Sequence, residues 1–407
     1  MNIHTEKKHN IILQQFSVFL FYIFIVCMVY ILPAFKFVAP YMIAAAMMLA
    51  TVVPFFLKKC PWTVYVVAMC SVFLMLTTIS IITGTASSPV DAVNTILIRN
   101  VRFFLPIFWS CYAFEYTTKK QQTIFLTLFS VIVVFVLIKT LIALETDPWI
   151  ARVLAQGKES TGSSINRYRL DNVGGFEYSY MMGIIAFCLT WSALKTKNIL
   201  LKVVSVAAVV LVFYYIIETM YTTLLLLTFA GVFILLFLNI KSPFVRGLLV
   251  VIAVTAFFFL APILGYLSTA FPKDSLLNVK FQNFYYALTQ GNVGKVGSRP
   301  DKIVHSVEQW LRSPLFGLYN PTSNAHSLVF STLETGGIVG FIPWFATFFV
   351  GYDILKKVCI KKGVDTQLLL VSFMYVIALS VFNPIGYVFE VTIAAFFIAP
   401  LCCSLLE

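Results

Sequence analysis

Charged residues are scarce in this chain. Only 11% of its 407 residues are Asp, Glu, Lys or Arg, against about 25% in typical soluble domains. Hydrophobic residues make up 60% of the chain. They form uninterrupted runs of about 20 residues, a length at which a helix crosses a hydrocarbon core about 30 Å thick. The composition therefore excludes a soluble globular domain. The continuous runs predict helices rather than the short alternating strands of a membrane barrel.

Residues that could bind a metal or a nucleotide are also missing. None of the eight Cys lies in the two long loops described below, and the Cys spacing matches neither a disulfide framework nor a zinc site. No Asp/Glu cluster, Gly-rich nucleotide loop or ATP-using soluble domain is evident. We therefore expect no metal and no cofactor. An enzyme with this sequence needs a preactivated, lipid-linked substrate.

Basic residues outnumber acidic ones, and the formal net charge is +12. The Lys and Arg residues are spread over many loops, so we expect no nucleic-acid partner. Membrane proteins concentrate them in short cytoplasmic connections. Here the short connections alternate between basic ones and others in which only Lys36 is basic, which predicts that both termini are cytoplasmic. The basic connections carry Lys7, Lys8, Lys58, Lys59, Lys119, Lys120, Lys195, Lys197, Lys202, Lys241, Arg246, Lys356, Lys357, Lys361 and Lys362.

About twelve apolar runs predict an all-α polytopic membrane protein, with residues 1–407 forming a single integral-membrane domain. The first run is long enough to predict an anchor rather than a cleavable signal peptide. Two connections are long, about 145–175 and 269–326, and the alternation makes both of them external loops. The predicted spans are 11–32, 37–57, 62–83, 93–114, 122–144, 176–194, 199–217, 220–240, 246–268, 327–352, 366–383 and 386–405.

The second external loop contains the sequence of a short helix. Ser298 is an expected N-cap, and Pro300 falls in the first turn. Apolar residues at helical spacing then share one face, and Pro314 and Gly317 are expected to end the helix. Such a helix lies on the membrane surface or caps the helix bundle.

Arginines in the first external loop are candidate phosphate ligands. The segment SSINRYRLDNVGGFEYSY (163–180) places Arg167 and Arg169 just before a predicted span. Arg169 is followed by Gly174 and Gly175, which permit close backbone approach, and an Arg fork suits a phosphate or pyrophosphate. For Arg167, anchoring at the membrane interface is an equally good interpretation.

The second external loop contributes one Arg and one His. Arg299 stands at the start of the predicted helix, where free backbone N–H groups and a guanidinium can together bind an anion. A solvated helix-start residue is the alternative. His326 precedes the tenth span, and its imidazole titrates near neutral pH, which suits a general base. An interfacial His bonded to a loop carbonyl is the alternative. His305 falls on the predicted helix and is expected to be solvated.

Three further charged residues are candidate substrate ligands. Arg99 and Arg102 share a face inside the fourth span, where charge is costly and usually lines a polar cavity. They could line a groove for a lipid phosphate or extend to the outer headgroups. Glu218 lies in the tight outer turn ETMY and could face the same cavity. Lys139 and Glu390 are close enough to span ends to be ordinary interfacial residues.

Together these features resemble the bacterial O-antigen ligase and O-antigen or capsule polymerase superfamily of membrane glycosyltransferases. The resemblance rests on the span layout, with a long external loop after the ninth span, and on two motifs. GSRPDKIVHSVEQWLRSPLFG (297–317) resembles a pattern of Gly, a small residue and Arg, then Trp, then Pro-Leu-x-Gly. AHSLVFSTLETGGIVG (325–340) resembles a His-Asn…Glu-x-Gly…Gly pattern. RLDNVGGFEY (169–178) resembles the family's shorter external loop.

The resemblance implies a GT-C-type glycosyltransferase fold in the bacterial inner membrane, with the active site facing the periplasm. The donor would be a glycan on undecaprenyl pyrophosphate and the acceptor a sugar hydroxyl on another lipid-linked repeat unit. Arg169 and Arg299 would hold the pyrophosphate, and His326 would take the acceptor proton. Inversion and metal independence are implied as well, and a chain-length regulator and a flippase are the suggested protein partners.

Two departures from the family pattern separate the possible activities. Ser327 stands where the family often has Asn. Tyr221, a further candidate substrate ligand, occupies the outer-turn position where many ligases carry an Arg. The missing cation favours a polymerase over a ligase that transfers glycan to lipid A-core. A transporter or flippase for lipid-linked oligosaccharide is a third possibility, but a transporter should carry polar residues along a path through the membrane. Here the buried charges lie in the outer half.

Overall fold

The computed structural model of the chain describes residues 31–38, 63–85, 88–93, 117–156, 162–272, 276–290, 298–319, 327–383 and 389–406, with isolated positions at 25, 29, 96, 106, 107, 110, 111 and 114. This part of the chain is all-helical and contains no strand. Its helices are α2 (Pro33–Val38), α4 (Thr63–Ile82), α5 (Pro89–Ala92), α7 (Lys119–Thr146), α8 (Ile150–Gln156), α9 (Gly162–Leu170), α10 (Phe176–Lys195), α11 (Ile199–Glu218), α12 (Thr222–Asn239), α13 (Pro243–Ala270), α14 (Leu276–Gln290), α15 (Ser298–Arg312), α16 (Leu328–Lys361), α17 (Gln367–Phe382), α18 (Phe389–Ile393) and α19 (Ala399–Leu406).

Five helices in the described ranges are long and apolar enough to cross a membrane. They are α7, α11, α12, α16 and the continuous stretch Phe389–Leu406, in which a π-helical segment (Ala394–Ile398) joins α18 to α19. Each falls on a predicted span. The helices α4, α10 and α17 also lie at predicted spans but are shorter or less apolar. Most of the predicted spans 11–32, 37–57 and 93–114 lies outside the described residues.

Helix α13 is bent in the middle. Its halves, Pro243–Thr255 and Phe258–Ala270, are bent by 50° relative to each other, and together they pass as a sixth candidate span. Pro262 lies inside the second half. Proline has no N–H to donate to the carbonyl four residues earlier, at Phe258, so the helix is weakened at the bend.

Helix α10 forms the centre of the bundle, and its first turns bond to three neighbouring helices. The Tyr178 hydroxyl donates to the Val133 carbonyl of α7 at 2.6 Å, and Ser179 shares a 2.9 Å hydrogen bond with Tyr215 of α11. The Tyr180 hydroxyl donates to Oδ1 of Asn383 at the end of α17, at 3.1 Å. All of these side chains are buried, where an unpaired hydroxyl is costly. The YSY sequence therefore fixes how α7, α11 and α17 surround α10.

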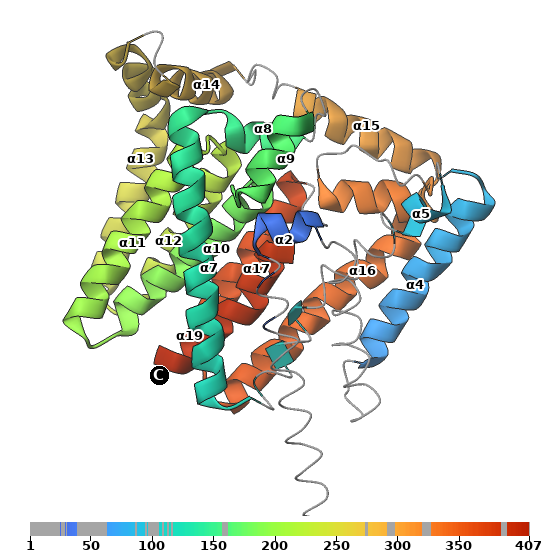
Figure 1. Cartoon of the computed structure of the whole chain (residues 1–407), viewed down its shortest axis with the longest axis horizontal. Coiled ribbons are helices and arrows are strands. Elements are labelled where there is room, and N and C mark those ends of the chain that lie inside the picture. Colours follow the sequence, from blue (N-terminus) through green and yellow to red (C-terminus); the bar gives the residue numbers. More distant parts are fainter. Residues whose placement is uncertain are drawn as a thin grey trace, which may run out of the picture.

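The helix ends form two groups at opposite ends of the bundle (Figure 1). At the basic end, Lys195, the last residue of α10, pairs with Asp365 before α17 at 3.4 Å, and Lys119 of α7 donates to the Ser404 carbonyl of α19. Asn239 of α12 also bonds there to Gln367 of α17, at 3.0 Å. The distal end holds α8, α9, α14 and α15 (Figure 1). The predicted cytoplasmic lysines of these helices thus lie opposite the two predicted external loops, as alternating spans require.

Candidate functional site at the distal end

The segment predicted to be the first external loop folds into α8 and α9 and packs on the ends of α7, α10 and α12. Tyr168 of α9 packs against a small buried cluster that includes Ile150, Leu154 and Val173. Tyr221 contacts the same cluster, and its hydroxyl donates to the Ala151 carbonyl of α8 at 2.6 Å. The Arg-bearing loop is therefore fastened to the outer turn that precedes α12.

Arg169 and Arg167 occupy different environments in the last turn of α9. Arg169 is half-buried and is followed by a tight turn in which Asn172 adopts a left-handed φ of 61°. The Asn172 side chain accepts a hydrogen bond from the backbone N–H of Ala34 in α2, at 3.1 Å. Arg167 is exposed, and its guanidinium lies 3.9 Å from the Asp171 carboxylate, a pair that contributes little in solvent.

The glycines after Arg169 make their close contacts within the protein. The Gly174 N–H donates to the Thr140 hydroxyl of α7 at 2.7 Å, and a Cβ at Gly174 would lie 2.5 Å from the Tyr178 ring. The sequence predicted that the backbone at these glycines would approach another group closely. In the structure, the backbone at Gly174 approaches α7 and α10. This close approach fixes the path of the chain from Arg169 into α10.

Glu218 and Tyr221 lie on either side of the turn between α11 and α12. Glu218 ends α11 and is half-buried, and Met220 takes a left-handed φ of 58° that turns the chain. The Tyr221 ring lies 6.1 Å from Phe176 and 5.7 Å from Tyr180 between centroids. The structure thus brings these two predicted residues to the end of the bundle that carries Arg169, and the Tyr221 hydroxyl is engaged in holding α8.

Buried polar side chains at the junction of α10, α16 and α17 were not predicted. Asn383 caps α17, accepts the Tyr180 hydroxyl bond, and has a buried Nδ2 with no hydrogen-bond partner in the described part of the chain. Glu390, expected near the membrane interface, is buried within the bundle and only 3% exposed. The span containing it starts inside the bundle. An Asn that interrupts an apolar run just before Pro384 is the signal that could have identified this site.

The start of α16 is fixed against α17. Ser327 caps α16 by accepting a bond from the Phe330 N–H and donates to the Ser380 carbonyl at 3.2 Å. The Leu328 N–H donates to the Asn383 carbonyl at 3.1 Å. His326 lies outside the described residues, as do Arg99 and Arg102. The described chain resumes immediately after His326, at a position held by two helices.

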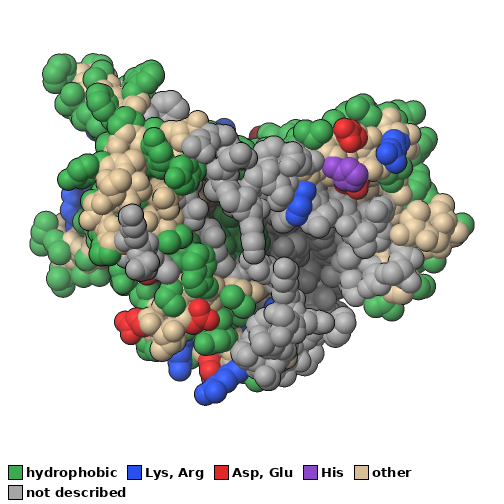
Figure 2. Space-filling model, turned by 90° about the horizontal axis from the view of Figure 1, so that it is seen from above, with side chains coloured by type: hydrophobic (Ala, Val, Ile, Leu, Met, Phe, Trp, Pro, Cys, Tyr) green, Lys and Arg blue, Asp and Glu red, His purple; other side chains and the backbone are tan. Residues whose placement is uncertain are grey.

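The helix predicted in the second long loop is present as α15, with Pro300 in its first turn and its end before Pro314, as expected. Ser298 is its first helical residue rather than the residue before the helix. His305 is exposed and lies 3.3 Å from the Gln309 amide, in agreement with the solvated position predicted for it. Arg299 falls in the first turn, although its side chain is outside the described set. Figure 2, which looks onto the distal end, shows histidine, acidic and basic side chains on the side where α15 lies and apolar ones towards α13 and α14.

Helix α16 is broken at Gly337, and the segment after α15 fills the break. Gly337 has φ 57° and ψ −159°, so the helical bonding pattern stops there. The free N–H groups of Ile338 and Val339 donate to the carbonyls of Pro314 and Leu315, at 2.9 and 3.0 Å. In return, the N–H groups of 318 and 319 donate to the carbonyls of 334 and 335, at 2.8 and 2.9 Å. We call these four bonds between 314–319 and 334–339 the backbone clamp.

Two glycines make the backbone clamp possible. Gly317 has φ 71°, and a Cβ there would lie 2.6 Å from the Gly337 nitrogen. The clamp is also tied to α4, because Ser80 and Thr85 both donate to the Tyr319 carbonyl, at 2.9 and 3.0 Å. It therefore holds α15 beside the short first arm of α16, as Figure 1 shows.

Replacement of Gly317 by Ala should destabilise the protein through loss of the clamp. An Ala at this position would be strained in the left-handed conformation, and several hydrogen bonds of the clamp would be lost. Together these effects should lower the free energy of unfolding by about 3 kcal/mol. The measurement is the midpoint of thermal unfolding in detergent. Gly363→Ala is the matched control, because Gly363 also has a positive φ of 75° but no neighbour within 4 Å of an added Cβ. Equal losses in the two variants would show that the clamp contributes nothing.

No group of three or more His, Cys, Asp or Glu in the described part of the chain could hold a metal ion. No protein-family model matches the chain, and no curated protein matches it.

Proposed function

We propose that this protein is a membrane glycosyltransferase that polymerises lipid-linked glycan repeat units into an O-antigen or capsule. It would transfer a growing glycan from undecaprenyl pyrophosphate to a sugar hydroxyl of another lipid-linked unit. The backbone clamp is the observation that carries this proposal. It joins the Pro-Leu-x-Gly end of one family-like motif (297–317) to the other (325–340), because the Pro314 and Leu315 carbonyls accept bonds from the N–H groups of Ile338 and Val339. Motifs that contribute to one site should meet in space, and these two do.

The reaction assigns a role to each candidate residue. Arg169 and Arg299 hold the pyrophosphate and stabilise the negative charge that develops on it. The acceptor hydroxyl oxygen forms a bond to the anomeric carbon on the face opposite the pyrophosphate, and the carbon–oxygen bond to the pyrophosphate breaks. His326 takes the hydroxyl proton. Undecaprenyl pyrophosphate leaves, and the anomeric configuration is inverted. No metal or cofactor takes part in this scheme.

The remaining candidates bind the substrate around this centre. Arg99 and Arg102 line a groove for the lipid phosphate, and Arg167 assists near the headgroups. Glu218 faces the sugars from the outer turn. Tyr221 acts by holding α8, since its hydroxyl is bonded to Ala151. An outer turn without a basic residue supports the polymerase over the ligase, which by resemblance would carry an Arg there.

The membrane arrangement is part of the proposal. The chain has twelve spans in a GT-C-type fold in the bacterial inner membrane, with both termini cytoplasmic and the distal end in the periplasm. The five apolar helices and the collection of lysines at the basic end support this arrangement. A chain-length regulator and a flippase are the protein partners expected beside it.

A reconstituted reaction tests the proposal. Purified protein supplied with a synthetic undecaprenyl-pyrophosphate repeat unit, without metal or nucleotide, should make chains of several repeats, read by gel electrophoresis and mass spectrometry. The same preparation with added lipid A-core should leave that acceptor unmodified. Transfer to lipid A-core without chain growth would identify a ligase instead. No transfer with the correct repeat unit would refute the glycosyltransferase.

A further inference from the structure

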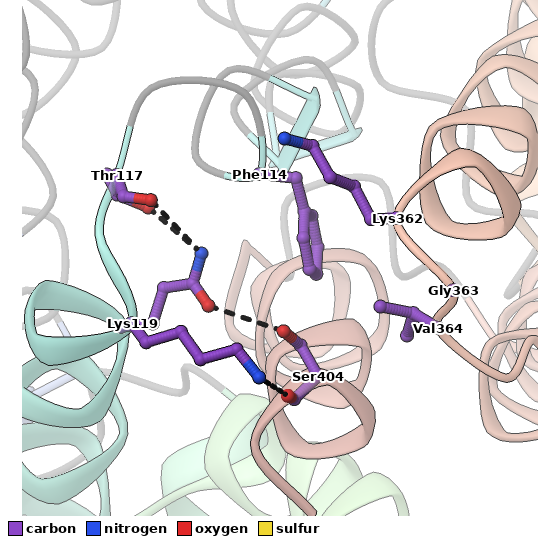
Figure 3. Close-up of a pocket in the computed structure, with 8 residues that line it drawn as sticks. Phe114, Thr117, Lys119, Lys362, Gly363, Val364 and Ser404 are labelled. Carbon is purple, nitrogen blue, oxygen red and sulfur yellow. Dashed lines mark hydrogen bonds between the residues drawn. The ribbon is translucent and has the colours of Figure 1, made fainter. Parts of the chain in front are cut away.

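A polar pocket lies at the basic end, away from the candidate catalytic site. It has a volume of about 350 Å³ and lies between the start of α7, the connection from α16 to α17 and the end of α19. Figure 3 shows Lys119 reaching across to Ser404, while Lys362 extends from the opposite wall. The lining of the pocket also includes Thr117, Gln122 and Phe114.

The polar groups of this pocket are only weakly engaged with one another. The Gln122 amide donates to the Thr117 hydroxyl at 3.3 Å, and the Ser404 hydroxyl donates to Gln122 at 3.4 Å. The Lys119 ammonium donates to the Ser404 carbonyl at 3.4 Å. All three bonds exceed the usual length of 2.7–3.2 Å. Donors held this loosely can reorient towards a better acceptor.

The charge in the pocket is positive. No described acidic side chain lines it, and Lys362 makes no ion pair within the described ranges. Asp365, which follows the lining residue Val364, is already engaged, because it pairs with Lys195 at 3.4 Å. Two ammonium groups without a described counter-ion favour an anionic occupant.

The pocket also lies where a lipid headgroup would be. Helix α7 is polar at its start and becomes apolar from Ile124, and its outer face exposes Ile124, Val131 and Ile138. An acyl chain can lie along this exposed face while the headgroup reaches the pocket. A volume of about 350 Å³ is near the lower limit of small-molecule sites. It accommodates a glycerophosphate group and is too small for a lipid-linked oligosaccharide.

We propose that this pocket binds the phosphate of an anionic phospholipid headgroup of the leaflet at the basic end, with Lys119 and Lys362 as its cationic ligands. Basic pockets between membrane helices on the cytoplasmic side are typical sites for such headgroups. The site is independent of the glycosyltransferase proposal. It links the start of α7 to the end of α19, so an occupied pocket stabilises the bundle at that end.

Lipid binding by the full chain in detergent tests this site. Native mass spectrometry should show retained phosphatidylglycerol in preference to phosphatidylcholine. The double variant Lys119→Gln/Lys362→Gln should bind phosphatidylglycerol about thirtyfold more weakly, since each surface cation contributes roughly fivefold. Lys197→Gln/Lys202→Gln is the matched control, because both residues are exposed at the same end outside the pocket. The control should bind as the wild type does.

Further arms separate the possible ligands. Lys119→Arg/Lys362→Arg should retain binding, because the charge is kept. Inorganic phosphate should not raise the thermal unfolding midpoint, whereas phosphatidylglycerol should raise it. Stabilisation by inorganic phosphate alone would overturn the lipid assignment. Equal retention of the two phospholipids, or equal weakening in the double variant and the matched control, would overturn the site. Lys119 and Lys362 are exposed, so the single Gln variants are also expected to fold, each with about fivefold weaker binding.

Discussion

Arg169→Ala and Arg299→Ala should each abolish polymer formation while the protein is still inserted at wild-type level. Each guanidinium is proposed to stabilise charge on the departing pyrophosphate, and loss of one such donor typically costs on the order of 10²–10³ in rate. Arg169 is half-buried in a turn braced by Asn172, so its position is fixed before substrate binds. The measurement is turnover of the purified variants on the lipid-linked repeat unit, together with membrane expression.

Controls distinguish this role from a general effect of charge. Arg312 lies exposed in the last turn of α15, at the opposite end from Arg299. Its replacement by Ala removes the same charge from the same helix and should leave turnover unchanged. Arg169→Lys should recover only part of the rate, since an ammonium cannot form the bidentate phosphate contact. Wild-type turnover in both Ala variants would refute the pyrophosphate role.

The helices that could be predicted from the sequence are those whose signal is local. The extent of α15 followed from Pro300 in its first turn and Pro314 beyond its end, because the effects of proline on a helix act within one turn. The helices α7, α11 and α12 followed from apolar runs bounded by lysine-bearing connections. The two short helices of the first external loop were read only as a long connection. They depend on packing with Tyr221, a residue far away in sequence.

The features that could not be predicted depend on pairs of distant segments. Gly317 and Gly337 were noticed as parts of separate motifs, but only the folded chain shows that the break at one is filled by the backbone beside the other. Likewise, Glu390 stands near the end of an apolar run, and its burial is set by the helices around it. The sequence shows how far a residue is from the end of an apolar run. It does not show which other helices pack against that end.

His326→Ala should lower kcat by about 10²–10⁴-fold with little change in KM for the donor, because a general base acts on the acceptor proton in the transition state. The described residues that follow His326 have defined partners. Ser327 and Leu328, which follow it directly, are bonded to the carbonyls of Ser380 and Asn383. Steady-state kinetics and a donor-binding measurement on the purified variant provide the test.

His305→Ala is the matched control for this prediction, since His305 is an exposed histidine on α15 within the same external loop. It should retain wild-type kcat. A rise in donor KM with unchanged kcat in the His326 variant would mean that this side chain binds the donor rather than moving a proton. Wild-type kinetics would show that His326 does not take part in catalysis. Its role would then be that of an ordinary histidine at the membrane interface. The proton would then have to pass to another group. The buried Asn383–Tyr180 pair would be the place to search for it, since the Asn383 carbonyl bonds to the first turn of α16.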